Sequence, residues 1–246
     1  MTRPVTVVTG GSRGIGAATC LRLAADGHDV AVGYVRAADA AEAVADGVRA
    51  AGGRCVTVRV DTSVDADVER LFDTAERRLG AVTGLVNNAG VTGPLGRLAD
   101  ADPAGLRRVV DVNLLGTLLC SRRAAQLMSA RGGGAIVNVS SAAATLGSPG
   151  EYVHYAAAKA AVDALTVGLA KELGPDGVRV NAVAPGVIDT EMHAAMGDPD
   201  RPHRAAAAIP LRRPGRVEEI AAAVAWLLSP DASYATGAVL RVAGGR

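Results

Sequence analysis

Two tyrosines and a lysine lie close together in the segment EYVHYAAAK, residues 151–159. The segment follows a Pro-Gly pair and runs into alanines, so we expect a helix to begin there. Side chains four residues apart share one face of a helix, which places Lys159 beside Tyr155 and Ala156 beside Tyr152. Only Tyr155 has a cation one turn along. An ammonium near a phenol favours the phenolate and so eases proton transfer near pH 7. The spacing therefore singles out Tyr155, although a solvated lysine near a core tyrosine would give the same pattern.

Lysine itself is scarce in this chain. Of its 26 lysine and arginine residues, only Lys159 and Lys171 are lysine. The compact ammonium of lysine, on a flexible stem, differs from the rigid fork of arginine. The choice of lysine at position 159 therefore favours a specific role for its amine.

A glycine-rich segment near the N-terminus has the composition of a phosphate-binding turn. The segment VTGGSRGIG, residues 8–16, follows an apolar run typical of a strand and opens a helical pattern. Glycines let the backbone turn tightly and approach a pyrophosphate, whose charge suits the free N–H groups of a helix N-terminus. We therefore expect dinucleotide binding here, the alternative being a glycine turn with no ligand.

Short apolar strands and helices alternate along the chain and must position these groups. Strands are expected at 5–9, 29–35, 54–60, 84–88, 135–140, 178–184 and 238–242. Helices are expected at 14–26, 38–51, 64–79, 103–131, 154–173 and 217–228. The alternation predicts an α/β fold with a doubly wound parallel sheet of Rossmann type and helices on both faces. Without a linker or repeat, residues 1–246 are expected to form a single dinucleotide-binding and catalytic domain, with the irregular segment 189–214 as a substrate lid.

Composition argues against several other classes of protein. A net charge of +1 and 2% aromatic residues offer neither a basic field nor a base-stacking surface, so no nucleic-acid partner is expected. The longest apolar helical run, 220–228, is too short to cross a bilayer, and no signal-peptide pattern opens the chain. Three distant cysteines and four histidines without ligand spacing predict neither disulfides nor a metal site. We expect a cytoplasmic protein without membrane association and with metal-free chemistry.

Six motifs, in order along nearly the whole chain, resemble those of the short-chain dehydrogenase/reductase family. They are T-G-x-x-x-G-x-G (9–16), NNAG (87–90), DVNLLG (111–116), IVNVSS (136–141), YAAAK (155–159) and VNAVAPGVIDT (180–190). The resemblance implies a catalytic set of Asn113, Ser141, Tyr155 and Lys159. Tyr155 would be the general acid and base, and Lys159 would lower its pKa and bond the nicotinamide ribose. Ser141 would donate a hydrogen bond to the substrate oxygen, and Asn113 would hold a water for proton return.

The serine assignment has an alternative. Ser141 lies fourteen residues before Tyr155, where members of the family commonly show thirteen. Ser140 therefore stays in reserve. Because neighbouring side chains at a strand end point to opposite faces, only one of the two hydroxyls is expected to face the site.

The glycine turn and the resemblance together imply the cofactor-binding residues. They are Gly10, Ser12, Arg13, Gly14, Ile15, Gly16, Tyr34, Arg36, Asp61, Thr62, Asn88, Ala89, Gly90, Tyr155, Lys159, Pro185, Gly186, Ile188 and Thr190. Asp61, at a strand end, has turn formation as its alternative role. About 20 residues past the glycine motif, an acid bonds the ribose 2′-hydroxyl, whereas an arginine accommodates a 2′-phosphate. Position 36 is arginine, and Arg13 would complete a phosphate clamp, so NADP(H) is expected and NAD(H) is the alternative.

The resulting prediction is an enzyme that reversibly transfers a hydride between NADP(H) and a ketone or aldehyde, or a secondary alcohol. The chain is similar to the 3-oxoacyl-acyl-carrier-protein reductase and glucose dehydrogenase branches, which leaves a 3-oxoacyl-thioester reductase with an acyl carrier protein partner as the narrower alternative. A non-catalytic NADP-binding regulatory protein is the other class, and the retained Ser141, Tyr155 and Lys159 argue against it. Alanine-rich helices at 103–131 and 154–173, which permit close pairing between subunits, and the resemblance together predict a homotetramer.

Overall fold

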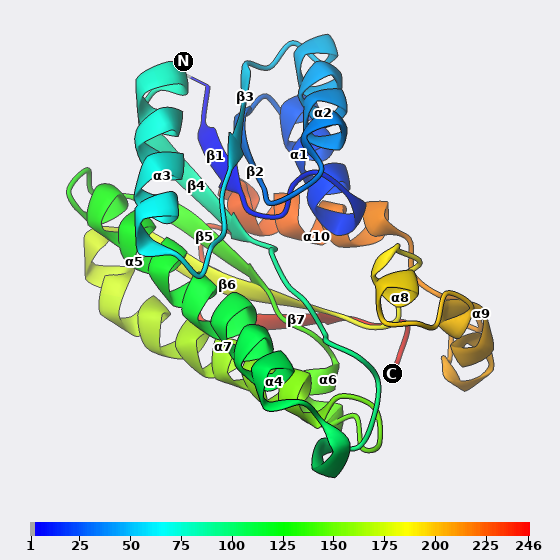
Figure 1. The fold of residues 1–246 in the computed structure, drawn as a ribbon. Helices are drawn as coiled ribbons and strands as arrows, with labels where there is room; N and C mark the ends of the chain where they lie inside the picture. Colours follow the sequence, from blue (N-terminus) through cyan, green and yellow to red (C-terminus); the bar gives the residue numbers. More distant parts are fainter. Residues whose placement is uncertain (1–2) are drawn as a thin grey trace.

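Seven parallel strands form one sheet in the computed structural model, which describes residues 3–246 (Figure 1). Their order across the sheet is β3-β2-β1-β4-β5-β6-β7. The strands are β1 (Val5–Val8), β2 (Asp29–Tyr34), β3 (Cys55–Arg59), β4 (Val82–Asn87), β5 (Gly134–Val139), β6 (Val178–Pro185) and β7 (Val239–Val242). Strand β1, made of valine and threonine, is buried along its whole length, as expected for a parallel strand covered on both faces.

Helices pack on both faces of the sheet (Figure 1). One face carries α1 (Gly14–Ala25), α2 (Ala38–Ala50) and α10 (Val217–Leu228), and the other carries α3 (Asp65–Leu79), α5 (Gly116–Ser129) and α7 (Val153–Leu173). Each face has its own buried apolar cluster, with Leu23 and Ile220 in one and Phe72 and Met128 in the other. The predicted doubly wound α/β fold is confirmed.

The direction of winding changes between the central neighbours β1 and β4. The chain runs outward from β1 to β3 on one side, then from β4 to β7 on the other. Loops leaving the carboxyl ends of β1 and β4 therefore diverge and leave a crevice between them. The glycine turn and the NNAG motif follow these two strands, so the topology brings them together.

The single long helix predicted over 103–131 is interrupted in the structure. It consists of α4 (Pro103–Val110), a π-helical turn η2 (Asp111–Leu115) and α5. Asn113 lies within this turn and is completely buried. Such a turn inserts an extra residue into a helix, which an apolar periodicity over thirty residues does not reveal.

The segment 189–214 is more regular than the sequence predicts. It contains α8 (Met192–Ala195), α9 (Arg201–Ala205) and the 3₁₀ turn η4 (Ala206–Ala208), which lie together at one end of the sheet (Figure 1). The remaining short elements are η1 (Leu98–Asp100), α6 (Ala143–Leu146), η3 (Gly174–Asp176) and η5 (Pro230–Ala232). Within residues 3–246, no helix combines the length and the apolar character that crossing a membrane requires.

Candidate active site

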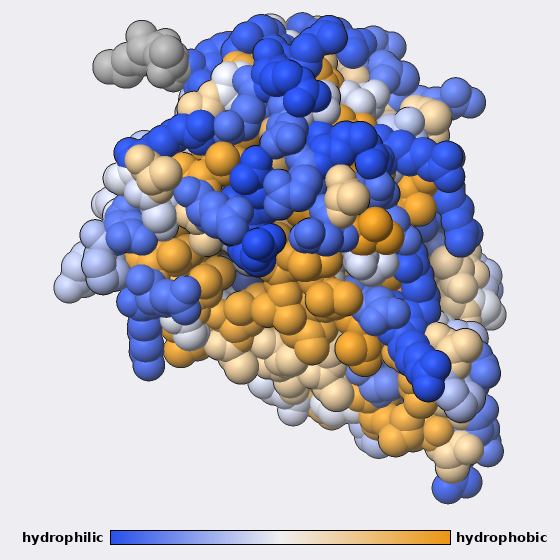
Figure 2. Space-filling model, turned by 60° about the vertical axis from the view of Figure 1, so that its left-hand side comes forward, coloured by the Kyte–Doolittle hydropathy of each residue, from blue (hydrophilic) through white to orange (hydrophobic). Residues whose placement is uncertain are grey.

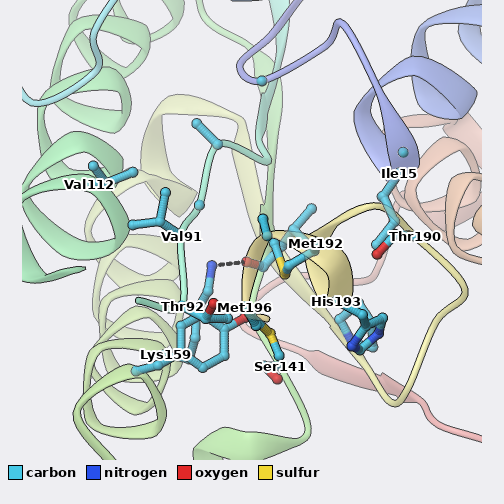
Figure 3. A pocket seen from close by; sticks show the side chains of 18 of the residues that line it. Ile15, Val91, Thr92, Val112, Ser141, Lys159, Thr190, Met192, His193 and Met196 are labelled. Carbon is cyan, nitrogen blue, oxygen red and sulfur yellow. Dashed lines mark hydrogen bonds between the residues drawn. The ribbon is translucent and has the colours of Figure 1, made fainter. Parts of the chain in front are cut away.

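A cavity of about 690 Å³ lies at the carboxyl ends of the central strands (Figure 3). Residues from the glycine turn, the NNAG motif, the end of β5, the start of α7 and the segment 189–214 line it. The predicted site residues among them are Gly10, Ser12, Arg13, Gly14, Ile15, Arg36, Asp61, Thr62, Asn88, Ala89, Gly90, Ser141, Tyr155, Lys159, Pro185, Gly186, Ile188 and Thr190. Gly16, Tyr34 and Asn113 do not line it. The fold thus brings residues from distant motifs to one cavity.

The turn after β1 requires glycine for two different reasons. Gly10 has a φ of +63°, in the left-handed region that side chains disfavour. A Cβ atom on Gly16 would lie only 2.3 Å from the carbonyl oxygen of Gly10. The turn leads into α1, whose first N–H groups have no partner within the helix. This arrangement suits an anionic group such as a pyrophosphate.

The NNAG loop holds the glycine turn in place. The side-chain amide of Asn88 donates hydrogen bonds to the carbonyl oxygens of Thr9 at 2.9 Å and Gly10 at 3.0 Å. In return, the Thr9 hydroxyl oxygen accepts from the backbone N–H groups of Asn88 and Ala89. Asn88 lines the cavity, but its amide hydrogens brace the turn.

Two exposed arginines border the cavity beside the glycine turn. Arg13 directly precedes α1, and Arg36 follows β2. Neither guanidinium has a hydrogen-bond or ion-pair partner in the described part of the chain. The first acid after Arg36 is Asp39, which lies in the first turn of α2 and does not line the cavity. The turn, the free N–H groups and these two cations fit a dinucleotide cofactor that carries an additional phosphate.

Two predicted cofactor residues have partners in the protein itself. Tyr34 packs against the apolar cluster between the sheet and α1. Asp61 lines the cavity, but its carboxylate accepts hydrogen bonds from the Ser63 N–H at 3.1 Å and hydroxyl at 2.6 Å. It also pairs with Arg108 at 3.0 Å. These contacts are those of a turn-forming aspartate, the alternative role considered for this residue.

Tyr155 and Ser141 meet at the cavity from different elements. Tyr155 lies in the first turn of α7 and is buried, and the Ser141 side chain lies near its hydroxyl. Ser141 follows β5, and its Oγ atom accepts from the Ala143 N–H at 3.1 Å. Burial raises the pKa of Tyr155 to about 12, and the polar side chain of Ser141 acts in the opposite direction.

Burial dominates the pKa of Tyr155 in this structure, and the expected lowering of that pKa by Lys159 stays a prediction. The Lys159 Nζ atom lies 5.8 Å from the centre of the Tyr155 ring and donates a 2.7 Å hydrogen bond to the Val139 carbonyl oxygen. Burial lowers the pKa of Lys159 itself to about 8, against the opposing effect of the Asp163 charge. Desolvation of the phenolate therefore outweighs the attraction of an ammonium at this distance.

Ser140 and Ser141 differ in their partners. Ser140 is buried, and its hydroxyl donates a long hydrogen bond of 3.4 Å to the Lys159 carbonyl oxygen. Both serines border the cavity, but the hydroxyl next to Tyr155 is that of Ser141.

Asn113 holds the loop that follows β4. Its Nδ2 atom donates to the carbonyl oxygens of Val91 at 2.7 Å and Val109 at 2.8 Å, and its Oδ1 atom accepts from the Val91 N–H. A Cβ atom on Gly90 would lie 2.8 Å from that Oδ1 atom and 3.7 Å from Lys159 Nζ. The amide of Asn113 therefore fixes the backbone next to Lys159.

Arg201 is a cavity residue that sequence reasoning missed. Its Nη2 atom donates to Tyr152 Oη at 2.8 Å and to Glu151 Oε2 at 2.7 Å. Tyr152 therefore also has a cation beside its hydroxyl, and this cation comes from the segment 189–214 rather than from the helix of Tyr152. In a chain with 24 arginines, nothing local marks a contact across 49 residues.

Comparisons with known proteins agree with this geometry. The family model described as "Enoyl-(Acyl carrier protein) reductase" matches residues 10–246. The chain is 45% identical to the uncharacterised oxidoreductase YgfF of Escherichia coli, over 98% of this chain and 99% of that one. It is 44% identical to a cis-4-hydroxycyclohexanecarboxylate dehydrogenase of Sinomonas cyclohexanicum, over 98% and 95% of the two chains. Identity is 40% to a 3-oxoacyl-[acyl-carrier-protein] reductase of Synechocystis, over 100% and 97%.

Solved structures show the same likeness. A short-chain type dehydrogenase/reductase from Mycobacterium marinum has a TM-score of 0.93 and 34% identity, covering 99% of this chain and 95% of that one. A blue fluorescent protein from a metagenomic library, solved in complex with NADPH, has a TM-score of 0.89 and 37% identity, covering 99% and 98%.

Proposed function

The chain belongs to the short-chain dehydrogenase/reductase family, and from that premise we propose that it transfers a hydride reversibly between NADP(H) and a ketone or secondary alcohol. It is an oxidoreductase by family. The observation that carries the proposal is the proximity of the buried Tyr155 and the half-buried Ser141 at the wall of a cavity that the glycine turn also lines.

Tyr155 is the proposed general acid and base. During reduction its hydroxyl gives a proton to the substrate oxygen, and during oxidation the phenolate takes the proton of the alcohol. The Ser141 hydroxyl donates a hydrogen bond to the same oxygen as negative charge develops on it. Lys159 adds positive charge near the phenol ring of Tyr155. Asn113 holds the backbone of Val91 in place through a hydrogen bond to its carbonyl oxygen.

NADP(H) is the proposed cofactor. The turn around Gly10 to Gly16 would hold its pyrophosphate, Arg13 and Arg36 its 2′-phosphate, and Lys159 its nicotinamide ribose. When bound, the cofactor donates or accepts the hydride, and its oxidised ring adds a positive charge that favours the phenolate of Tyr155. The related structure solved with NADPH supports this choice, as does the lack of a cavity acid directly after β2.

The relatives' names suggest two substrate classes. One relative is a dehydrogenase of a 4-hydroxycyclohexanecarboxylate, a secondary alcohol on a ring. Another is a 3-oxoacyl-[acyl-carrier-protein] reductase. Its name suggests a 3-oxoacyl thioester as the second candidate substrate, with an acyl carrier protein as partner. The proposal further includes one catalytic domain over residues 1–246, a lid formed by 189–214 and a cytoplasmic homotetramer.

A carbonyl panel tests the proposal. Oxidation of NADPH is measured with ring ketones, small ketones, sugars and 3-oxoacyl thioesters. Each carbonyl is assayed with the native chain and with the Tyr155→Phe variant. We expect turnover of at least one carbonyl class by the native chain. Tyr155→Phe should lower the rate by at least about 100-fold, with the Kd for NADPH unchanged because the change removes one hydroxyl and little volume. Full activity of the variant would rule out Tyr155 as the proton donor.

A further inference from the structure

The wall of the cavity beyond Tyr155 is mostly apolar. Leu146, Met192, Met196 and the ring of Tyr152 contribute to it. Figure 3 labels Met192 and Met196 among the side chains that line the same cavity as Ser141. Such a wall suits the carbon skeleton of a small ring or short chain placed with its oxygen at Tyr155 and Ser141.

One cation interrupts this apolar wall. Arg201, from α9, lines the cavity, and its side chain is only 10% exposed. Its guanidinium carbon lies 5.4 Å from the centre of the Tyr152 ring. That ring meets the Tyr155 ring edge to face, with 5.4 Å between the ring centres. The guanidinium is therefore one aromatic ring away from the proposed acid.

The guanidinium has donors to spare. Both of its hydrogen bonds, to Tyr152 and Glu151, use the Nη2 atom. The three N–H bonds on Nε and Nη1 have no acceptor within residues 3–246, and neither atom is sealed from solvent. Glu151 balances the charge from the outside, with 41% of its side chain exposed. The acids that line the cavity itself are Asp61, which pairs with Arg108, and the exposed Glu191.

We propose that the substrate carries a carboxylate several bonds from the reacting carbon, and that Arg201 binds it through an unused N–H donor on Nε or Nη1. A guanidinium N–H group donates a short, charge-assisted hydrogen bond to a carboxylate oxygen. Partial burial strengthens the attraction, since solvent screens it less. The inference rests on the proposed function, because it places the substrate oxygen at Tyr155.

The competing explanation is that Arg201 only fastens α9 to the start of α7. The two explanations differ in what Glu151 does. If the ion pair is only structural, changing either Arg201 or Glu151 weakens the contact between α9 and α7. If Arg201 binds a substrate carboxylate, neutralising its competing partner Glu151 raises the affinity for that carboxylate, and removing the guanidinium lowers it.

The test compares 4-oxocyclohexanecarboxylate with its uncharged carboxamide as substrates for reduction by NADPH. The native chain should prefer the carboxylate in kcat/KM by about 10- to 100-fold, the range for hydrogen bonds to a charged group. Arg201→Met should abolish that preference, Glu151→Gln should increase it, and Tyr152→Phe should retain it. Tyr152→Phe is the matched control, since it removes one partner of Arg201 and leaves both charges. Titration of the native chain with cyclohexanecarboxylate in the presence of NADP should give binding that Arg201→Met loses, which reports on the site independently of turnover.

Each other result is decisive. Equal losses for both substrates in Arg201→Met and Glu151→Gln would reduce Arg201 to a fastener and overturn the inference. Preference for the carboxamide, or for 3-oxoacyl thioesters without a carboxylate, would also overturn it while leaving the proposed function intact. Absence of turnover with every carbonyl of the panel would instead contradict the proposed function.

Discussion

At the scale of single residues, the two serines after β5 differ in their surroundings. The Ser141 side chain lies near Tyr155, whereas the Ser140 hydroxyl donates to the Lys159 carbonyl oxygen. We expect Ser141→Ala to lower kcat by about 100- to 1,000-fold, the effect of losing one donor to a developing oxyanion. Ser140→Ala should reduce kcat much less and lower thermal stability instead. Steady-state kinetics and thermal unfolding of both variants check this, and the reverse ranking of kcat would identify Ser140 as the reacting serine.

The charge of Lys159 predicts a pH dependence. Burial lowers its pKa to about 8, so the ammonium is lost as pH rises through that value. We expect kcat/KM for reduction to fall above about pH 8, since a neutral amine no longer favours the phenolate of Tyr155. The charge of Asp163 raises the pKa of Lys159, so Asp163→Asn should move this fall in kcat/KM, the alkaline limb of the pH profile, to lower pH. Glu172→Gln, an exposed change on the same helix, should leave it in place. A limb that does not move in Asp163→Asn belongs to another group.

The same group links pH to stability, with a definite sign. The pKa of Lys159 in the folded protein lies below its ordinary value of 10.5. Between about pH 8 and 10.5 the unfolded chain therefore binds more protons than the folded one, and the contribution of this residue to stability rises with pH. Below pH 8 both states are protonated and the contribution is constant.

The pairing of Tyr155 with Lys159 follows from helical spacing, and the sequence predicts it without difficulty. The pKa of Tyr155 cannot be predicted from the sequence in the same way. It depends on how completely the folded chain removes the phenol from water, which helical spacing does not reveal. The contact of Tyr152 with Arg201 was also beyond reach, since it joins residues 49 positions apart whose types are common in this chain.

At the scale of elements, the strands and most helices were predictable because each has a clear period and ends at glycine, proline or a charged residue. The π-helical turn at Asp111–Leu115 was not, since it arises where Asn113 bonds the backbone of Val91 and Val109. The short helices α8 and α9 were missed as well. Four or five residues are too few to show a helical period, and their stability depends on packing against the rest of the molecule.

The loop between β2 and α2 predicts the cofactor preference. Arg36, which follows β2, borders the cavity without a partner in the described part of the chain, and Arg13 borders it from the glycine turn. Arg36→Ala should weaken NADPH binding by about 1.5–3 kcal/mol and leave NADH binding nearly unchanged. Arg78→Ala, an exposed change on α3 away from the cavity, should affect neither. Calorimetric titration with both cofactors measures this, and an equal loss for NADPH and NADH would contradict a phosphate clamp.

At the scale of the whole molecule, the exposed apolar residues include two sets on different elements. Figure 2, in which the side carrying α3, α5 and α7 comes forward, shows a broad apolar area on that side. Leu115, Leu118 and Val167 are exposed on η2, α5 and α7. The second set is Trp226 on α10, Val239 on the edge strand β7 and the fully exposed Tyr234, between η5 and β7. Exposed apolar surface of this kind marks interaction sites.

We expect each of these two sets to contact its own copy in another chain. Two such two-fold contacts generate a closed tetramer, because one forms a dimer and the other joins two dimers. We therefore expect light scattering at micromolar concentration to give four times the chain mass of 24.7 kDa. Leu118→Glu places a charge in the set formed by Leu115, Leu118 and Val167. This variant should form dimers held by the set that contains Trp226. Trp226→Glu should leave dimers held by the first set, and the double variant should be monomeric. Leu21→Glu, at an exposed apolar position on α1, should remain tetrameric. A monomeric mass for the unaltered chain would contradict the assembly, whereas an unchanged tetramer in the double variant would place the contacts elsewhere on the surface.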